Sequence, residues 1–184
     1  FVWSPINAIL LRPLPYHESE RVMQLSGYVT TEQRGTYGSW SFPDYVDAST
    51  ELRDVFASVA VHTTRSFNVG GGTEPERLRG ARVSPSLFPL LGVRPALGRF
   101  FRPDEDGDAR VAVIGYGVWE RKFGRAPDII GRTIPIDGAP YEVIGVMARG
   151  MRIPEREDLW LPLHPGEARA HRDWRFYQVS ARLA

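Results

Sequence analysis

Short runs of β-forming residues, separated by glycine and proline, recur along this 184-residue chain and constrain its fold more than any other feature. The 18 Gly and 15 Pro predict many turns and therefore short elements. In residues 132–147, two β-rich runs flank Asp137 and Gly138, a pair that favours the positive φ angles of a tight hairpin turn. Residues 177–183 alternate apolar with polar side chains, which is typical of a strand with one buried face. Further strands are predicted at residues 21–25, 57–62, 67–69, 77–83, 111–114 and 159–163.

Three helices are predicted between these strands. Ser41 and Asp44 have the spacing of a capping box, and apolar residues recur at helical spacing up to Phe56. A second, short helix is expected to begin at Ser84, or later because Pro89 in its interior would cost a hydrogen bond, and is ended by a glycine at residue 92. A third follows residues 111–114, where Tyr116, Trp119 and Phe123 share one face before Gly124.

The remaining segments are predicted to be connections. Residues 26–38 are expected to form a polar, Gly-rich loop, and residues 70–72, three glycines in succession, are expected to connect two strands of a hairpin. About nine strands and three helices in this irregular order predict an α+β fold rather than a doubly wound parallel sheet. The length suits one domain of ordinary size or two small interlocked ones.

Charge and cysteine content exclude several classes of function. The chain has 23 basic and 22 acidic side chains, so it lacks the positive field that holds nucleic acid, and no nucleic-acid partner is expected. With no Cys, the chain has neither a disulfide framework nor a thiolate metal site or nucleophile. A nucleophile elbow, a zinc-protease helix and a phosphate-binding loop motif are also missing from the sequence.

Two loops carry residues that bind ligands in other proteins. The glycines at residues 70–72 are not followed by the Lys and Ser/Thr of a phosphate-binding loop, so a hairpin turn is the better interpretation. Asp104, Asp106 and Asp108 faintly resemble a calcium loop, but the position that requires a terminal Glu is Gly115. A solvated acidic loop is therefore expected.

A third group could suit zinc. His164, Glu167 and His171 have a spacing that places them on one helical face, but Pro165 and Gly166 argue against a continuous helix there. The sequence therefore predicts no catalytic, cofactor-binding or metal-ligating residue and no cofactor. The tryptophans are spread evenly and are expected to be separate core anchors: Trp3, Trp40, Trp119, Trp160 and Trp174.

The first eleven residues are mostly apolar and uncharged, and they end abruptly at Arg12 and Pro13. A run of this length is too short to cross a bilayer, which needs about 20 residues. Three interpretations remain open: a buried strand or helix, the outer end of a transmembrane helix, and a remnant of a signal peptide.

Several stretches together resemble one known family. The sequence resembles the MacB-like periplasmic core domain of ABC transporter permeases of the FtsX-like class, most closely the duplicated orphan permeases of acidobacteria. The resemblance covers nearly the whole chain, with the same order of motifs and similar gaps. It is carried by residues 7–16 (NAILLRPLPY), 41–45 (SFPDY), 75–84 (PERLRGARVS), 91–99 (LGVRPALGR), 119–124, 130–133 and 144–147.

This resemblance implies a domain organisation. Residues 1–15 are then the end of a transmembrane helix and its exit from the membrane, although Ser4 and Pro5 depart from a straight helix. Residues 16–98 plus 158–184 correspond to a porter-like mixed α/β subdomain, and residues 99–157 to an inserted smaller β-rich subdomain. Family members continue into a further helix and strand, so the porter-like part is expected to be incomplete at its C-terminal side, with an edge that another copy could cover.

The resemblance also implies a function. It predicts a noncatalytic domain of an inner-membrane permease, facing the periplasm and joined to the membrane through flanking transmembrane helices. Such a domain couples ATP hydrolysis by a separate ABC ATPase subunit to extracytoplasmic transport or mechanotransmission, with a homodimer or a periplasmic adaptor as possible further partners. The alternative is a periplasmic substrate-binding module for a peptide, lipid or small molecule, with a cleft between the two parts. An unrecognised hydrolase is a third interpretation.

Overall fold

One mixed sheet runs through the part of the chain that the computed structural model describes, residues 18–184 without 32–33, 72–73, 106, 152 and 154–155. The helical elements are η1 (Ser19–Arg21), α2 (Phe42–Glu51), α3 (Leu87–Leu91), α4 (Tyr116–Phe123) and η2 (Gly166–Arg169). The strands are β1 (Val22–Leu25), β2 (Gly27–Thr31), β3 (Arg34–Gly38), β4 (Phe56–Val69), β5 (Glu76–Val83), β6 (Pro95–Gly98), β7 (Val111–Ile114), β8 (Thr133–Ile136), β9 (Ala139–Met147), β10 (Leu159–Pro162) and β11 (Gln178–Leu183).

The strand order of the nine-stranded sheet is β1-β11-β4-β5-β10-β7-β9-β6, with β8 paired to β4 and β9. Two neighbouring pairs, β5 with β10 and β7 with β9, are parallel, and the other pairs are antiparallel. β1 and β4 flank β11 and are connected through α2, which is a split β-α-β unit. Helices combined with a mixed sheet confirm the α+β prediction.

The longest strand is β4, and it joins two regions of the sheet. Its first half pairs with β11, up to His62 opposite Gln178. Its second half pairs with β5, from His62 opposite Val83 to Val69 opposite Glu76. The prediction of two separate strands at 57–62 and 67–69 is therefore wrong, because pairing continues through the polar residues between them.

The helix ends follow their sequence signals. The Ser41 hydroxyl caps α2 by accepting a hydrogen bond from the Asp44 backbone N–H at 3.2 Å. α2 ends at Glu51, and Phe56, predicted to lie on the helix, instead begins β4. Gly92 and Gly124 end α3 and α4 with φ of 64° and 58°, as predicted.

The α3 helix has the later of the two expected starts. Its first residue is Leu87 rather than Ser84. Pro89 therefore lies in the first turn, where a backbone N–H has no partner within the helix and proline is tolerated.

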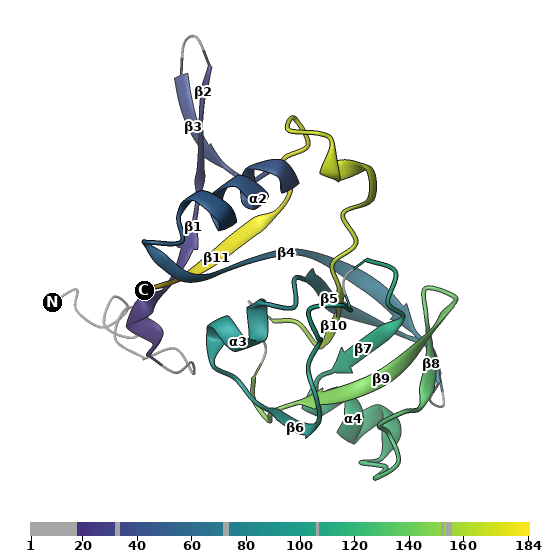
Figure 1. Ribbon diagram of the computed structural model, residues 1–184. Coiled ribbons are helices and arrows are strands. Elements are labelled where there is room, and N and C mark those ends of the chain that lie inside the picture. Colours follow the sequence, from purple (N-terminus) through teal and green to yellow (C-terminus); the bar gives the residue numbers. More distant parts are fainter. Residues whose placement is uncertain (1–17, 32–33, 72–73, 106, 152, 154–155) are drawn as a thin grey trace, which may run out of the picture.

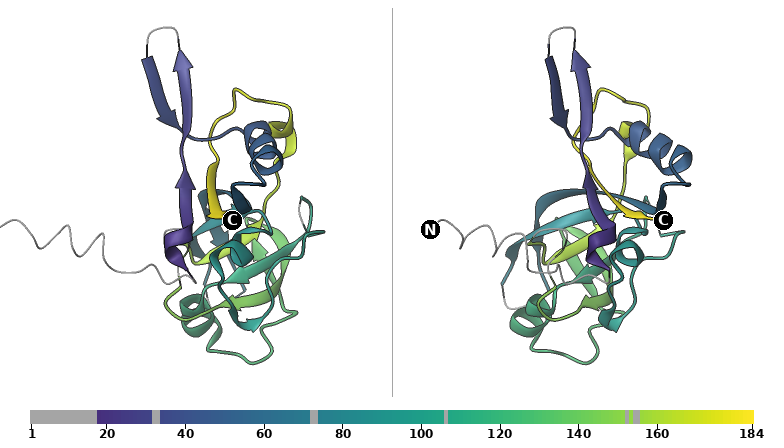
Figure 2. Two further views of the ribbon diagram at one scale, coloured as in Figure 1. Left: turned by 60° about the vertical axis from the view of Figure 1, so that its left-hand side comes forward. Right: turned by 90° about the vertical axis from the view of Figure 1, so that its left-hand side faces the viewer.

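The predicted hairpin around Asp137 is present, and a second hairpin was missed. Asp137 and Gly138 have φ of 47° and 80° and connect β8 to β9. Residues 26–38, predicted to be a loop, contain β2 and β3, which pair only with each other and place Gly27 opposite Gly38. In Figures 1 and 2 this hairpin stands away from the rest of the molecule. Its glycines and polar residues lack the apolar alternation that identifies a half-buried strand. The short β6 was also missed, because two of its four residues, Pro95 and Gly98, are of types that are rare in strands.

Three apolar clusters form the core. The first lies beneath α2 and contains Phe42, Val61, Leu163, Ala168, Tyr177 and Val179. The second surrounds α4 and includes Phe67, Leu78, Ile114, Trp119, Ile134 and Leu161. The third packs around α3, on the other side of β4 from α2 (Figure 1), and includes Ala60, Val83, Phe88, Met147 and Trp160.

The second cluster draws on both predicted subdomains. Phe67 and Leu78 come from the segment 16–98, whereas Ile114, Trp119 and Ile134 come from the segment 99–157. The strands β7 and β9 of the second segment also continue the common sheet. The division into a porter-like part and an insertion stays a prediction, and its two parts share a sheet and a core.

The expected membrane segment, residues 1–15, lies outside the described residues. Within the described ranges, no helix has both the length and the apolar character needed to cross a bilayer.

An ion pair between two partly buried side chains anchors the loop that follows β6. The Arg99 guanidinium donates two hydrogen bonds of 2.6 Å to the Glu105 carboxylate, which also accepts one from the Arg102 backbone N–H at 2.9 Å. The hydrogen bonds from Arg99, followed by that from Arg102, outweigh desolvation and hold the pKa of Glu105 below its ordinary value. The acidic loop expected from sequence is thus anchored by one of its carboxylates.

We expect Glu105→Gln to lower the free energy of unfolding by about 1 to 2 kcal/mol at pH 7, because a charged bidentate acceptor is lost. Since the folded-state pKa of Glu105 is lowered, the stabilisation is fully present above the unfolded pKa of about 4.3 and is lost as the pH falls from there through the folded-state pKa. Urea unfolding at pH 7 and at pH 3 measures the difference. Exposed Asp104→Asn is the control; an equal loss in both variants would contradict this assignment.

Candidate functional site

A groove lies on the face of β4 that carries two core clusters. Along this face, Val61 belongs to the first cluster and Phe67 to the second. Between them stand Thr63 and Arg65, which point to the same side because side chains alternate along a strand. The polar pair therefore marks a gap between the two apolar cores.

The groove has a volume of about 500 Å³. Its base is formed by β4 and β5, where Thr63 lies opposite Arg82. One wall is the connection between β10 and β11, residues 163–177, which we call the strap. The strap residues that line the groove are Leu163, His164, Pro165, Glu167, Ala168, Trp174, Phe176 and Tyr177. A smaller cavity of about 230 Å³ adjoins it, also lined by Arg82 and His164, together with Arg110 and Tyr141.

The half-buried Arg82 is central to both cavities. Its guanidinium donates to the Pro162 carbonyl oxygen at 3.1 Å and to the Tyr141 hydroxyl at 3.5 Å, which are both neutral acceptors. Among the described residues, no carboxylate lies within salt-bridge distance of Arg82. Arg65, by contrast, is paired with Asp137 at 2.7 Å.

Two aromatic side chains of the strap are exposed at the groove. Trp174 is 40% exposed and Phe176 is 47% exposed. The Trp174 ring stacks on His171 with a centroid separation of 4.3 Å, and Phe176 lies 4.4 Å from the buried Tyr177 ring. Burial raises the pKa of the Tyr177 hydroxyl, which therefore stays protonated at neutral pH.

The prediction that the tryptophans are core anchors is correct for two of them and wrong for Trp174. Trp119 and Trp160 are buried, and the indole N–H of Trp160 donates to the Ile153 carbonyl. Trp40 is half-buried and donates to the Leu25 carbonyl at 2.9 Å. Trp3 lies outside the described residues.

The strap is fastened to α2 by ion pairs. One carboxylate oxygen of Asp44 lies 2.6 Å from Arg172 and the other lies 2.5 Å from Arg175. Arg172 also reaches Asp47 at 2.7 Å, and the Arg169 guanidinium lies 5.3 Å from the Phe42 ring centroid. The aromatic wall of the groove is therefore positioned by the first turn of α2.

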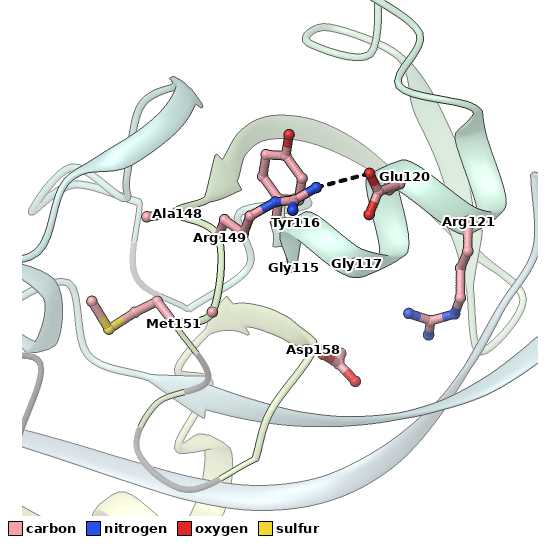
Figure 3. A pocket seen from close by; sticks show the side chains of 10 residues that line it. Gly115, Tyr116, Gly117, Glu120, Arg121, Ala148, Arg149, Met151 and Asp158 are labelled. Carbon is pink, nitrogen blue, oxygen red and sulfur yellow. Dashed lines mark hydrogen bonds and ion pairs between the residues drawn. The ribbon is translucent and has the colours of Figure 1, made fainter.

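A separate cavity of about 370 Å³ lies at the start of α4, between Tyr116 and the loop that follows β9. Figure 3 shows Arg149 beside Tyr116, with its guanidinium 3.0 Å from Glu120. Arg121 is likewise paired, with Glu76 at 2.6 Å. Because both arginines are neutralised by carboxylates, this cavity offers little charge to a ligand.

The residues weighed for metal binding do not converge. Across the described residues, no three His, Asp or Glu side chains are grouped so that they could hold a metal ion. The Nδ1 atom of His164 lies 3.4 Å from Asp108, whereas His171 lies beside Asp173 at 3.6 Å. Asp106 is outside the described residues.

The groove residues were missed by sequence reasoning, although a signal for them existed. The run from Thr63 to Ser66 interrupts two apolar β segments with polar residues that still favour strands. Such an interruption inside one strand indicates a place where its covering layer is missing. Trp174 carried a second signal, because its neighbours are charged rather than apolar.

Comparison with known proteins gives the class of this fold. Three solved structures superpose on most of the chain. The periplasmic region of MacB from Actinobacillus actinomycetemcomitans has a TM-score of 0.65 at 17% identity, covering 89% of this chain and 75% of the other. The extracellular domain of the ABC-type transporter YknZ from Gram-positive bacteria has a TM-score of 0.64 at 16% identity, with coverage of 88% and 83%. A domain of a putative permease from Porphyromonas gingivalis has a TM-score of 0.68 at 14% identity, with coverage of 92% and 77%. The chain therefore shares the fold of these three domains.

The family follows from the sequence match. The family described as MacB-like periplasmic core domain matches residues 14–184. The chain belongs to this family, which confirms the resemblance noted from its motifs. The family is a periplasmic domain of ABC transporter permeases and is not itself catalytic.

Curated relatives match shorter stretches. The pyoverdine export ATP-binding/permease protein PvdT of Pseudomonas syringae pv. tomato is 48% identical over 62 residues, which are 33% of this chain and 10% of that protein. The macrolide export ATP-binding/permease protein MacB of Nitrosomonas europaea is 34% identical over 94 residues, which are 48% of this chain and 14% of that protein. The chain thus corresponds to a small part of each relative.

We expect Asp44→Ala to loosen the strap, because both of its anchoring arginines lose their shared carboxylate. Amide hydrogen exchange measured by mass spectrometry should become several-fold faster in residues 166–176, and the free energy of unfolding should fall by about 1 kcal/mol. Asp47→Ala is the matched control, since it removes one contact of Arg172 and leaves Arg175 in place. Equal exchange of the strap in the two variants would show that Asp44 does not hold it.

Proposed function

We propose that this chain is the noncatalytic periplasmic domain of an inner-membrane ABC transporter permease, and that it couples ATP hydrolysis by a separate ABC ATPase subunit to extracytoplasmic transport or mechanotransmission. In this proposal, transmembrane helices flanking the domain join it to the membrane, and a second copy or a periplasmic adaptor is a further partner. The relatives are named as export proteins for pyoverdine and for macrolides, which favours export as the direction of transport.

The observation that carries this proposal is the shared strand β4. At about 3.3 Å per residue, its 14 residues extend over roughly 45 Å. One half is hydrogen-bonded to β11, which pairs with β1, and the other half is hydrogen-bonded to β5. Because both halves belong to one continuous backbone, a displacement of the β1–β11 end is transmitted to the β5 side and to the core around α4. This is the rigid-body behaviour that a hinge or shear transition requires.

A spin label far from the β1–β11 end tests the coupling role. Asp128 is exposed and lies after α4, and the chain has no Cys, so Asp128→Cys gives a unique attachment point within it. In the full permease, reconstituted with its ATPase in nanodiscs, we expect the distance distribution between labels on two copies to shift by several Å when ATP is added. Pulsed electron paramagnetic resonance measures this distance.

The same label is compared with an ATPase variant that binds but does not hydrolyse ATP. That control separates movement on binding from movement during turnover. An identical distance distribution in all nucleotide states, together with the absence of cross-linking between copies or to an adaptor, would argue against coupling.

A second candidate function, a periplasmic substrate-binding module, is supported by the groove. Its volume of about 500 Å³ is within the range of small-molecule sites, and it combines exposed aromatic groups with a few polar ones. The groove also lies between two core clusters that share β4. The two functions are compatible, because a ligand there would contact both sides of the strand that transmits movement.

A further inference from the structure

We propose that the groove between the strap and β5 binds a small aromatic molecule that carries one anionic group, with its ring against Trp174 and Phe176 and its anionic group at Arg82. This inference deepens the second candidate function above and is independent of the coupling role. It rests on the neutral partners of Arg82 and on two exposed aromatic rings that line the same groove.

Arg82 provides the anion-binding element. Guanidinium groups pair with carboxylate, sulfonate or phosphate through two parallel N–H donors. Here Nη1 donates to the Pro162 carbonyl oxygen and Nη2 to the Tyr141 hydroxyl, the second at a long 3.5 Å. These contacts fix the side chain without neutralising it. A half-buried cation held in place with only neutral partners favours an incoming anion.

Trp174 and Phe176 provide the apolar element. Large aromatic side chains are normally buried, and exposing them costs free energy that a ligand can recover. Both line the same groove as Arg82, and the ion pairs of Asp44 with Arg172 and Arg175 order the strap that carries them. Since this wall is ordered before a ligand arrives, less conformational entropy is lost on binding.

The surrounding charges limit the ligand to a low charge. Arg110 lines the adjoining cavity and, within the described part of the chain, has no carboxylate partner. Exposed Glu167 lines the groove and exposed Asp108 lines the adjoining cavity, and both oppose a second negative charge, while Arg65 is occupied by Asp137. A monoanion with a planar ring therefore suits the site better than a polyanion.

Two fluorescent probes with one scaffold test the site. Anilinonaphthalene sulfonate has fused rings and a single negative charge, and phenylnaphthylamine has the same rings without the charge. Titration of the 184-residue chain in detergent-free buffer should give saturable one-to-one binding of the charged probe and weaker binding of the neutral one.

Arg82→Gln should weaken the charged probe about tenfold, because a charge-assisted pair is lost, and should leave the neutral probe unchanged. Arg82→Lys should give an intermediate loss of affinity for the charged probe, since the lysine keeps the positive charge but lacks the two parallel N–H donors of a guanidinium. Trp174→Ala should weaken both probes about fivefold. Glu167→Gln should tighten the charged probe only.

One control lies on the same strand as Arg82, and the other lies outside the groove. Arg77→Gln removes an exposed arginine from β5, and Val55→Ala removes an exposed apolar side chain outside the groove. Circular dichroism melting identifies any variant that fails to fold. Because Trp174 and Glu167 are exposed, their variants keep the test valid even if Arg82→Gln is unstable.

The proposal is overturned if Arg82→Gln affects both probes equally, if Arg77→Gln has the same effect, or if binding does not saturate. These outcomes leave the nucleotide-dependent movement of the Asp128 label untouched. Conversely, if the distance between the Asp128 labels does not change with ATP, the measured affinities of the two fluorescent probes still stand. Failure of the groove and failure of the coupling role are therefore distinguishable.

Discussion

The hydrogen bonding of β4 to different partners along its length is the constraint on which the rest of the structure depends. β11 pairs with the first half and β5 with the second, and the two halves meet at His62. His62 is buried, and its Nε2 lies 2.8 Å from the Gln178 side-chain oxygen, so the crossover itself is fixed by a side-chain contact. Neither half of the strand can shift along its partners without breaking the register of the other half.

The groove is a consequence of this arrangement. The face of β4 that carries Val61 and Phe67 is covered by α2 and the strap at one end and by the core around α4 at the other. Covering both ends leaves a stretch at Thr63 and Arg65 where neither layer reaches. A ligand in that stretch would touch the strap and β5 together, so its binding free energy would depend on how the two are placed. Any movement that changes their separation would then change affinity, which is the linkage that coupled transport requires.

Sequence reasoning predicted the parts of this fold that depend on local chemistry. The turn at Asp137 and the glycine ends of α3 and α4 each follow from backbone preferences of the residues involved. Sequence reasoning failed where tertiary contacts determine the extent of a strand or the position of a site. β4 was divided at its polar centre because periodicity cannot show that both edges of a strand are paired. The groove was missed for the same reason, since Arg82 and Trp174 are 92 residues apart in sequence and only the sheet topology brings them together.

The contrast between the two larger cavities shows why charge pairing, rather than size, identifies the candidate site. At the start of α4, Arg149 and Arg121 line a cavity of similar scale, but Glu120 and Glu76 already neutralise them. A ligand there must compete with an existing carboxylate, and the exchange of one ion pair for another yields little net free energy. At Arg82 the competing partners are a carbonyl and a phenol, so an anion adds an interaction without displacing one of equal strength. The aromatic rings matter for a separate reason, because an arginine open to solvent binds anions weakly by itself. Trp174 and Phe176 add apolar contact with the ligand and exclude water from the ion pair between Arg82 and the anionic group.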